Sequence, residues 1–76
     1  MSIRDLMEQG IRIQGAFQIK EWSNAKEIYT TISEGSEFEF ESSDIEDEIL
    51  DMEIEYMYSI PTEIGMAAMV FEMENK

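Results

Sequence analysis

The chain begins with a helical spacing of apolar residues. Three of them recur at i, i+3 and i+4, as on one side of a helix: Ile3, Leu6 and Met7. Ser2 precedes this pattern and Asp5 stands at the third helical position, which is the arrangement of a capping box. Gly10 suits the left-handed conformation that ends many helices. Because two turns are unstable alone, we expect residues 2–9 to form a helix packed on a sheet.

The next part of the chain alternates between apolar and polar residues, which is typical of half-buried strands. Between 11 and 22, four apolar residues fall on one face: Ile11, Ile13, Phe17 and Ile19. Gly15 interrupts this face and indicates a bend, a bulge or a close approach of the helix. A turn at 23–25 leads into a second alternating segment at 26–33. The two segments predict a hairpin.

Two further strands are predicted in the C-terminal half, at 51–59 and 66–74. The first is expected to place four apolar residues on one face: Met52, Ile54, Tyr56 and Tyr58. Pro61 supports a turn after it, because proline cannot donate to a central ladder. A helix is the alternative over MAAMVF in the second, but Gly65 and the final alternation favour a strand.

The middle of the chain allows two interpretations. Residues 37–41 fit a short strand or an extended loop. Ser43 with Glu46 three residues later matches a helix cap. Two apolar residues follow at helical spacing and are expected to face inward: Ile45 and Ile49. We expect one or two helical turns within 42–50, and a continuous strand to Tyr58 is the alternative.

Together these elements predict a single α+β domain over residues 1–76. It has a four- to five-stranded, mostly antiparallel sheet, an N-terminal helix packed on one face and a short second helix. Sequential hairpins are the simplest topology. A chain of 76 residues buries only a modest core, and a net charge of −13 adds self-repulsion. A homodimer therefore stays open as a way to bury more surface.

The composition excludes several kinds of chemistry. The chain has no cysteine and no histidine, which removes thiolate metal sites, the commonest general base and the commonest zinc ligand. No pair of carboxylates is singled out for acid–base work, so we expect neither catalysis nor a cofactor. A calcium loop that begins at Asp44 fails, because Ile49 stands where that loop needs glycine. We expect no dedicated metal site.

The location is also constrained by the sequence. No basic region followed by an apolar run marks a signal peptide. No apolar stretch reaches the 18 residues of a membrane span. The negative charge opposes direct binding to nucleic acid and to anionic membranes. These observations predict a cytoplasmic protein with a basic protein surface as its partner.

The densest charge lies between Glu34 and Glu55, where eleven of 22 residues are Asp or Glu and none is Lys or Arg. Apolar residues are interleaved with the acids, unlike in a disordered acidic tail. In a strand, alternate residues share a face about 6.6–6.8 Å apart, similar to the phosphate spacing along a tilted DNA strand. We therefore predict a partner-binding surface that imitates nucleic acid, formed by Glu37, Glu39, Glu41, Asp44, Glu46, Asp47, Glu48, Asp51, Glu53 and Glu55.

Other interpretations of these residues remain open. The acidity can serve solubility alone, in a small structural or accessory module that is a monomer or a dimer. Seven methionines fill a small core or form an adaptable binding surface. Five aromatic residues are candidate interface anchors if one face of the sheet carries no helix: Trp22, Phe38, Phe40, Tyr56 and Tyr58.

Two segments, IRDLMEQGIRIQGAF at positions 3–17 and DIEDEILDMEIEYMY at 44–58, resemble small acidic proteins carried by phages and conjugative elements of Gram-positive bacteria. They cover under half of the chain. In size and charge, the chain is similar to inhibitors of host defence nucleases, including anti-CRISPR proteins, some of which imitate DNA. The resemblance implies a non-enzymatic inhibitor in the cytoplasm of the host bacterial cell. Its partner would be a CRISPR or restriction nuclease. That class shares no sequence signature, so no residue roles are carried over.

Overall fold

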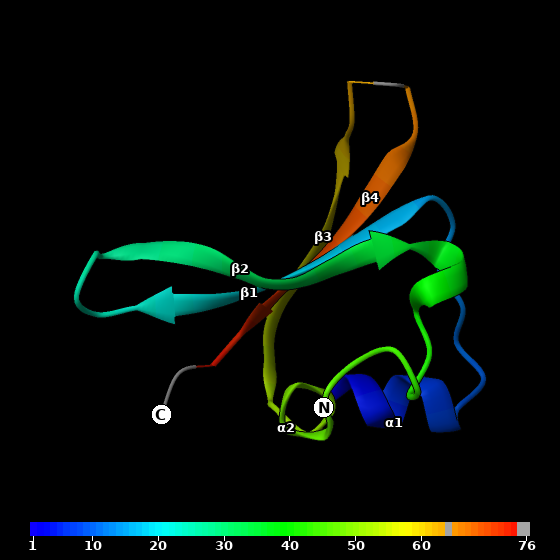
Figure 1. The fold of residues 1–76 in the computed structure, drawn as a ribbon, viewed down its shortest axis with the longest axis horizontal. Helices are drawn as coiled ribbons and strands as arrows, with labels where there is room; N and C mark the ends of the chain where they lie inside the picture. The colour runs from blue at the N-terminus through cyan, green and yellow to red at the C-terminus, as the bar shows by residue number, and fades with distance from the viewer. Residues whose placement is uncertain (64, 75–76) are drawn as a thin grey trace.

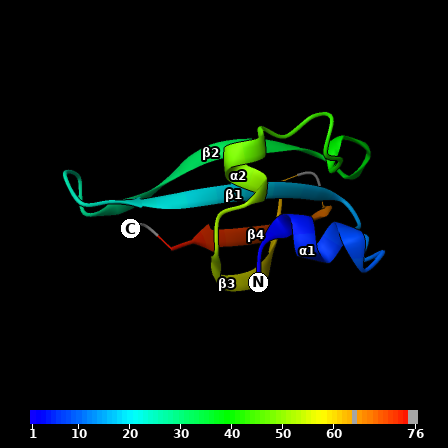
Figure 2. The same ribbon diagram turned by 90° about the horizontal axis from the view of Figure 1, so that it is seen from below.

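A computed structural model, which describes residues 1–63 and 65–74, shows a four-stranded sheet with two short helices (Figure 1). The elements in chain order are α1 (Ile3–Glu8), β1 (Ala16–Ser23), β2 (Ile28–Ser36), the 3-10 turn η1 (Glu37–Glu39), α2 (Asp47–Leu50), β3 (Ile54–Pro61) and β4 (Ala67–Met73). Seen from below, both helices lie in front of the same face of the sheet (Figure 2). The predicted α+β fold with an N-terminal helix and a short second helix is confirmed.

Helix α1 has the capping box that the sequence predicts. The Ser2 hydroxyl accepts the Asp5 backbone N–H at 3.2 Å, and the Asp5 carboxylate accepts the Ser2 N–H at 2.9 Å. These bonds favour the ionised carboxylate and hold the pKa of Asp5 below its ordinary value. Gly10 follows the helix with a φ of 76°. The start of the chain is tied to β3, because the Ile54 N–H donates to the Met1 carbonyl at 2.8 Å.

The sheet is mixed, with the strand order β2-β1-β4-β3. The two predicted hairpins, β1–β2 and β3–β4, are antiparallel, but β1 and β4 join them in parallel. The simple sequential order is therefore wrong. The reason is burial: β1 and β4 carry the most buried strand residues and occupy the centre, so the segment between β2 and β3 must cross from one edge to the other.

The core lies between the sheet and the helices. Phe40 is its central ring, with a centroid 5.3 Å from Phe17 in an edge-to-face contact and 5.6 Å from Phe71 in a stacked contact. Helix α2 contributes Ile49 and Leu50. The remaining buried members of this cluster are Ile3, Leu6, Ile19, Ile45 and Met73. The helical interpretation of the middle segment is thus confirmed, although α2 begins at Asp47, later than the predicted cap at Ser43 implies.

Three local predictions differ from the structure. Residues 11–15 are not part of a strand, and β1 begins at Ala16. The glycines on either side of residues 11–14, Gly10 and Gly15, both have positive φ, which differs from strand backbone. Residues 37–39 form η1, and neither the short strand nor the extended loop is seen there. A bulge pairs Ile54 with Met73 but Tyr56 with Glu72, so Ile54 and Tyr56 lie on opposite faces of β3 and their predicted shared face is wrong.

Gly15 marks a close approach, although the neighbour is β4 and not the helix. Its φ is 85°, and a Cβ placed there would lie 2.1 Å from the Ala67 carbonyl oxygen. Gly10 has a similar φ of 76° but has nothing within 4 Å of such a Cβ. Gly10→Ala should therefore carry only the left-handed backbone cost, roughly 1–2 kcal/mol.

We expect Gly15→Ala to lower the free energy of unfolding by clearly more, on the order of 3 kcal/mol or above, because backbone must move to relieve the clash. Urea denaturation of both variants measures the difference. Equal losses in the two variants would show that the β1–β4 approach is looser than the structure has it.

Candidate acidic interaction surface

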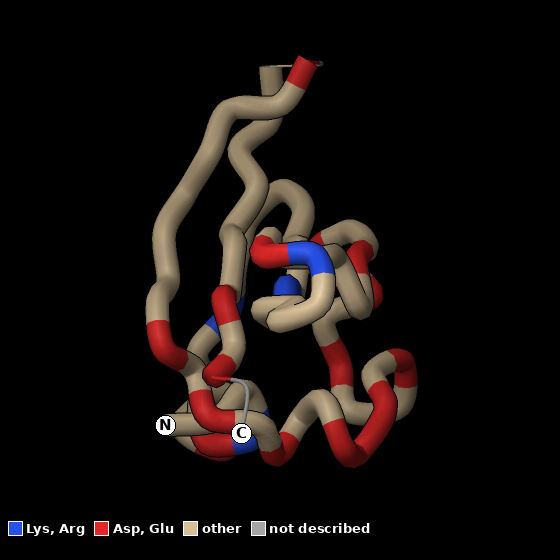
Figure 3. Tube along the Cα trace, turned by 90° about the vertical axis from the view of Figure 1, so that its left-hand side faces the viewer, with Lys and Arg blue, Asp and Glu red and all other residues tan. Residues whose placement is uncertain are grey.

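The acidic residues 37–55 run from the end of β2, through η1 and α2, to the start of β3; we call them the acidic band. In Figure 3 the red positions gather along the lower end and one side of the molecule. The upper part of the β3–β4 hairpin is tan up to a single acidic position at its tip. That position is Glu63, the only charged residue between Glu55 and Glu72. The negative charge is thus unevenly distributed over the surface.

The fold leaves the predicted carboxylates in solvent. Nine of the ten are exposed, and Glu37 is half-buried. Most apolar residues between them point inward, as Phe40, Ile45 and Ile49 show by their burial in the core, and Phe38 is the exception. The amphipathic pattern therefore produces a surface with carboxylates outside and the core directly beneath.

The regular strand spacing proposed for this surface is absent. Glu37 and Glu39 lie on a 3-10 turn, and the Glu39 carboxylate accepts the Ser36 N–H at 3.2 Å. Glu55 lies in the bulge of β3. An extended strand would place Phe38 and Phe40 on the same face, whereas the turn leaves Phe38 exposed and Phe40 buried. The predicted imitation of DNA therefore rests on the density of exposed charge, without an even repeat along a strand.

Helix α1 neutralises part of the band. Arg4 Nε donates to Asp51 at 2.6 Å, and Arg4 Nη2 lies 3.3 Å from Asp47. The pKa of Arg4 is raised, mainly by its hydrogen bond to Asp51 and next by that to Asp47. The N-terminal ammonium group pairs with Glu53. The other carboxylates of the band make no ion pair within residues 1–63 and 65–74. No ion pair there offsets their charge.

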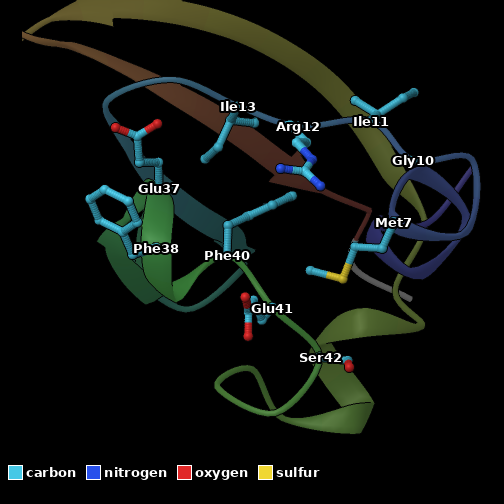
Figure 4. Close-up of a pocket in the computed structure, with 10 residues that line it drawn as sticks. All are labelled: Met7, Gly10, Ile11, Arg12, Ile13, Glu37, Phe38, Phe40, Glu41 and Ser42. Atoms are coloured by element: carbon cyan, nitrogen blue, oxygen red, sulfur yellow. The ribbon is translucent and has the colours of Figure 1, made fainter.

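An exposed aromatic residue lies inside the band. The Phe38 side chain is 81% exposed, between Glu37 and Glu39. It lines an open hollow of about 550 Å³ beside η1. Figure 4 shows Arg12 reaching into this hollow from the α1–β1 connection. Sequence reasoning missed the hollow, because it forms between segments 7–13 and 37–42 that only the tertiary fold brings together.

The sheet face opposite the helices carries aromatic residues. Trp22 and Tyr29 pack edge to face with centroids 5.2 Å apart. The Tyr58 hydroxyl donates to the Glu72 carboxylate at 3.0 Å. No helix in the described part of the chain covers this face. It therefore offers a second surface, with aromatic rings next to carboxylates.

This face gives a testable pH dependence. The pKa of Tyr58 lies above its ordinary value of 10.0, first because of partial burial and then because of the bond to Glu72. A raised folded-state pKa stabilises the fold below pH 10.0, and the stabilisation is lost as the pH rises through the raised value. Glu72→Gln removes the negative charge and should shift tyrosinate absorbance to lower pH. Glu63→Gln at the hairpin tip is the control and should leave the curve unchanged. Identical curves for Glu72→Gln and the native chain would contradict this contact.

Comparison with known proteins gives no match to a family model, a curated protein or a solved structure. Within residues 1–63 and 65–74, no group of three or more acidic side chains is placed to hold a metal ion. None of the helices there is long and apolar enough to cross a membrane.

Proposed function

We propose that this protein inhibits a host defence nuclease, in the manner of anti-CRISPR proteins that imitate DNA. The acidic band would occupy a basic groove that otherwise holds nucleic acid. The observation that carries the proposal is the exposure of nine of the ten predicted carboxylates, outside a core that fixes their positions. A solvated tail would not hold its charges in place, whereas these follow η1, α2 and the start of β3.

The partner is a basic nucleic-acid-binding protein, a CRISPR or restriction nuclease in the cytoplasm of the host bacterium. In an RNA-guided nuclease, arginines read the short motif beside the target, and carboxylates compete for such arginines with charge-assisted hydrogen bonds. Opposite charge speeds association and makes the affinity depend on salt. The protein acts by occupying a site, without catalysis, without a cofactor and without binding nucleic acid itself.

Phe38 offers an apolar contact, which the carboxylates alone do not provide. Salt bridges at a solvated rim contribute little, whereas an aromatic residue that fills a pocket contributes much of the binding energy at many interfaces. Phe38 is the most exposed of the large apolar residues described and is flanked by carboxylates. We infer that it packs against an apolar spot on the partner, while the surrounding acids pair with Lys and Arg.

Capture from a bacterial lysate tests the proposal. Tagged protein is loaded at low salt and eluted with a salt gradient, and the bound proteins are identified. The matched control is the triple variant of the band described in the Discussion. A nuclease that elutes from the native chain, is lost from the variant and is blocked from cutting DNA by the pure protein supports the proposal. Capture of the same proteins by both chains contradicts it.

A second candidate is a dimeric structural or accessory module, and the β3–β4 arm favours it. The arm comprises residues 56–61 of β3 and 67–69 of β4. Ala68 and Met69 pair with β1, so only the tip of the arm, at Pro61 and Ala67, extends beyond β1 (Figure 1). Tyr56 and Met57 are more than half exposed. Strand β3 is also at the edge of the sheet, where unpaired backbone groups can pair with another strand. Residues 56–62 carry no charge, so two such edges can meet without opposed carboxylates.

If the arm dimerises, light scattering should show a dimer whose share grows with salt, because salt screens the repulsion between two chains of charge −13. Tyr56→Lys on β3 should give a monomer. Thr31→Lys on the other sheet edge is the control and should not. Phe71 is unsuitable for this test, since it is only 1% exposed and belongs to the core. A native chain that stays monomeric at high salt and high concentration contradicts this candidate.

A further inference from the structure

A hollow of about 460 Å³ lies on the sheet face that the helices leave open. We call it the aromatic–acid pocket, and its lining comes from three strands and from the residue that follows the fourth. Trp22 belongs to β1, Tyr29 to β2 and Glu55 to β3, while Glu74 directly follows β4. This pocket is separate from the hollow beside η1, which shares none of its lining residues.

The aromatic wall of the pocket is held in place by the sheet. Trp22 and Tyr29 are paired in register across β1 and β2, and their rings meet at 69°. The Trp22 indole N–H donates to the Asn24 side-chain oxygen at 2.9 Å, which restrains the ring. Both side chains are half-buried. The pocket therefore has a preformed π surface.

The acidic wall faces these rings. The Glu74 N–H donates to the Glu53 carbonyl at 2.9 Å, which ties the end of β4 to β3 close to Glu55. The pKa of Tyr29 is raised, first by burial and next by the charges of Glu55 and Glu72. The negative potential thus reaches the aromatic wall. Lys20 pairs in register with Glu72, but it does not line the pocket.

We propose that the aromatic–acid pocket binds the cationic head of an arginine or lysine side chain, with arginine preferred. A cation over an aromatic face gains from the ring quadrupole, and Trp is the best such face. A planar guanidinium group can stack on the ring while its N–H groups donate to carboxylates at its edge. Trp22 supplies the ring, and Glu55 and Glu74 supply the carboxylates. As the binding site for an exposed arginine of a basic partner, the pocket rests on the proposed function.

The single tryptophan of the chain makes the pocket directly observable. N-acetylarginine amide is titrated at physiological salt while Trp22 fluorescence is followed. A saturable change with a midpoint of order millimolar is expected, as for one side chain in a surface pocket. N-acetylcitrulline amide, which has nearly the same shape without the charge, should give no saturable change, and the lysine derivative should bind more weakly than arginine. Equal responses to arginine and citrulline would overturn the proposal.

Matched variants separate the pocket from the general charge of the protein. Glu55→Gln with Glu74→Gln should weaken arginine binding at least fivefold. Glu39→Gln with Glu48→Gln removes two charges of the acidic band that do not line the pocket, and should change the midpoint less than twofold. Lys76→Gln removes an ammonium group two residues from Glu74 in sequence and should leave binding equal or tighter. Equal weakening of arginine binding by the two double variants would overturn the proposed pocket. The absence of a saturable fluorescence change in both the native chain and Lys76→Gln would also overturn it.

The small-molecule titration is independent of any nuclease. If arginine fails to bind while the protein still displaces DNA from its partner, the pocket is wrong and the proposed function stands. If arginine binds here but the band variants displace DNA as well as the native chain, the pocket stands and the proposed role of the band is wrong.

Discussion

Phe40→Ala is expected to remove most of the folding stability of the protein at room temperature, whereas Phe38→Ala, two residues earlier, leaves the fold intact. Phe40 is 8% exposed and contacts Phe17 and Phe71, while Phe38 is 81% exposed. Deleting a buried phenylalanine ring costs about 3–5 kcal/mol. A domain of this size has a stability near the lower end of roughly 5–15 kcal/mol. The Phe40 variant thus loses most of its free energy of unfolding.

Circular dichroism and urea denaturation of the two variants measure this contrast. Phe38→Ala should stay within about 0.5 kcal/mol of the native chain, as for surface substitutions elsewhere. The pair also separates stability from binding, because Phe38→Ala should weaken partner binding in a folded protein. Equal stability losses from the two substitutions would show that η1 does not orient these rings as the structure has them.

Reversing three charges of the acidic band is expected to weaken partner binding strongly without unfolding the domain. Glu41, Asp44 and Glu48 are exposed and make no ion pair among the described residues, so Lys at these positions breaks no contact with Arg4 or the N-terminus. Each reversal replaces an attraction to a basic groove with a repulsion. A combined loss of at least about 100-fold corresponds to roughly 2.7 kcal/mol, which is modest for three charge contacts.

The matched control carries the same three reversals outside the band, at Glu8, Glu27 and Glu63, which are also exposed. The two triple variants have the same net charge, so only the location of the charges differs. We expect the control to lose less than tenfold in affinity, measured by calorimetry against the captured partner. Equal losses would mean that overall charge, and not the band, determines binding.

The sequence predicts those parts of the fold that depend on neighbours in the chain. The capping box of Ser2 and Asp5 is a local signal, and it is confirmed. Ile45 and Ile49 are both buried as predicted, but Ile45 precedes α2, so they do not lie on one helix. The alternation of Glu and Phe at residues 37–40 is also a local signal, but it wrongly favours a strand. Phe40 packs between Phe17 and Phe71, and this tertiary contact selects a 3-10 turn over a strand.

The site was predictable to a similar degree. Interleaved acids and apolar residues correctly predict exposed carboxylates over a core. The pairing of Arg4 with Asp51 spans 47 residues of sequence and has no local signal. The aromatic–acid pocket depends on the parallel pairing of β1 with β4, since this places Glu74 and Glu55 beside Trp22. Sequence periodicity does not specify that the two hairpins join through β1 and β4, or that these two strands run parallel.

The most direct test of the central claim is competition with DNA for the captured nuclease. Labelled duplex DNA bound to the nuclease is titrated with the pure protein at several salt concentrations. If the acidic band imitates DNA, the protein should displace the DNA completely, and its affinity for the nuclease should fall steeply as salt rises, because like-charged ligands share one basic groove. A complex that holds DNA and the protein together, or an affinity that is unchanged by salt, would contradict it.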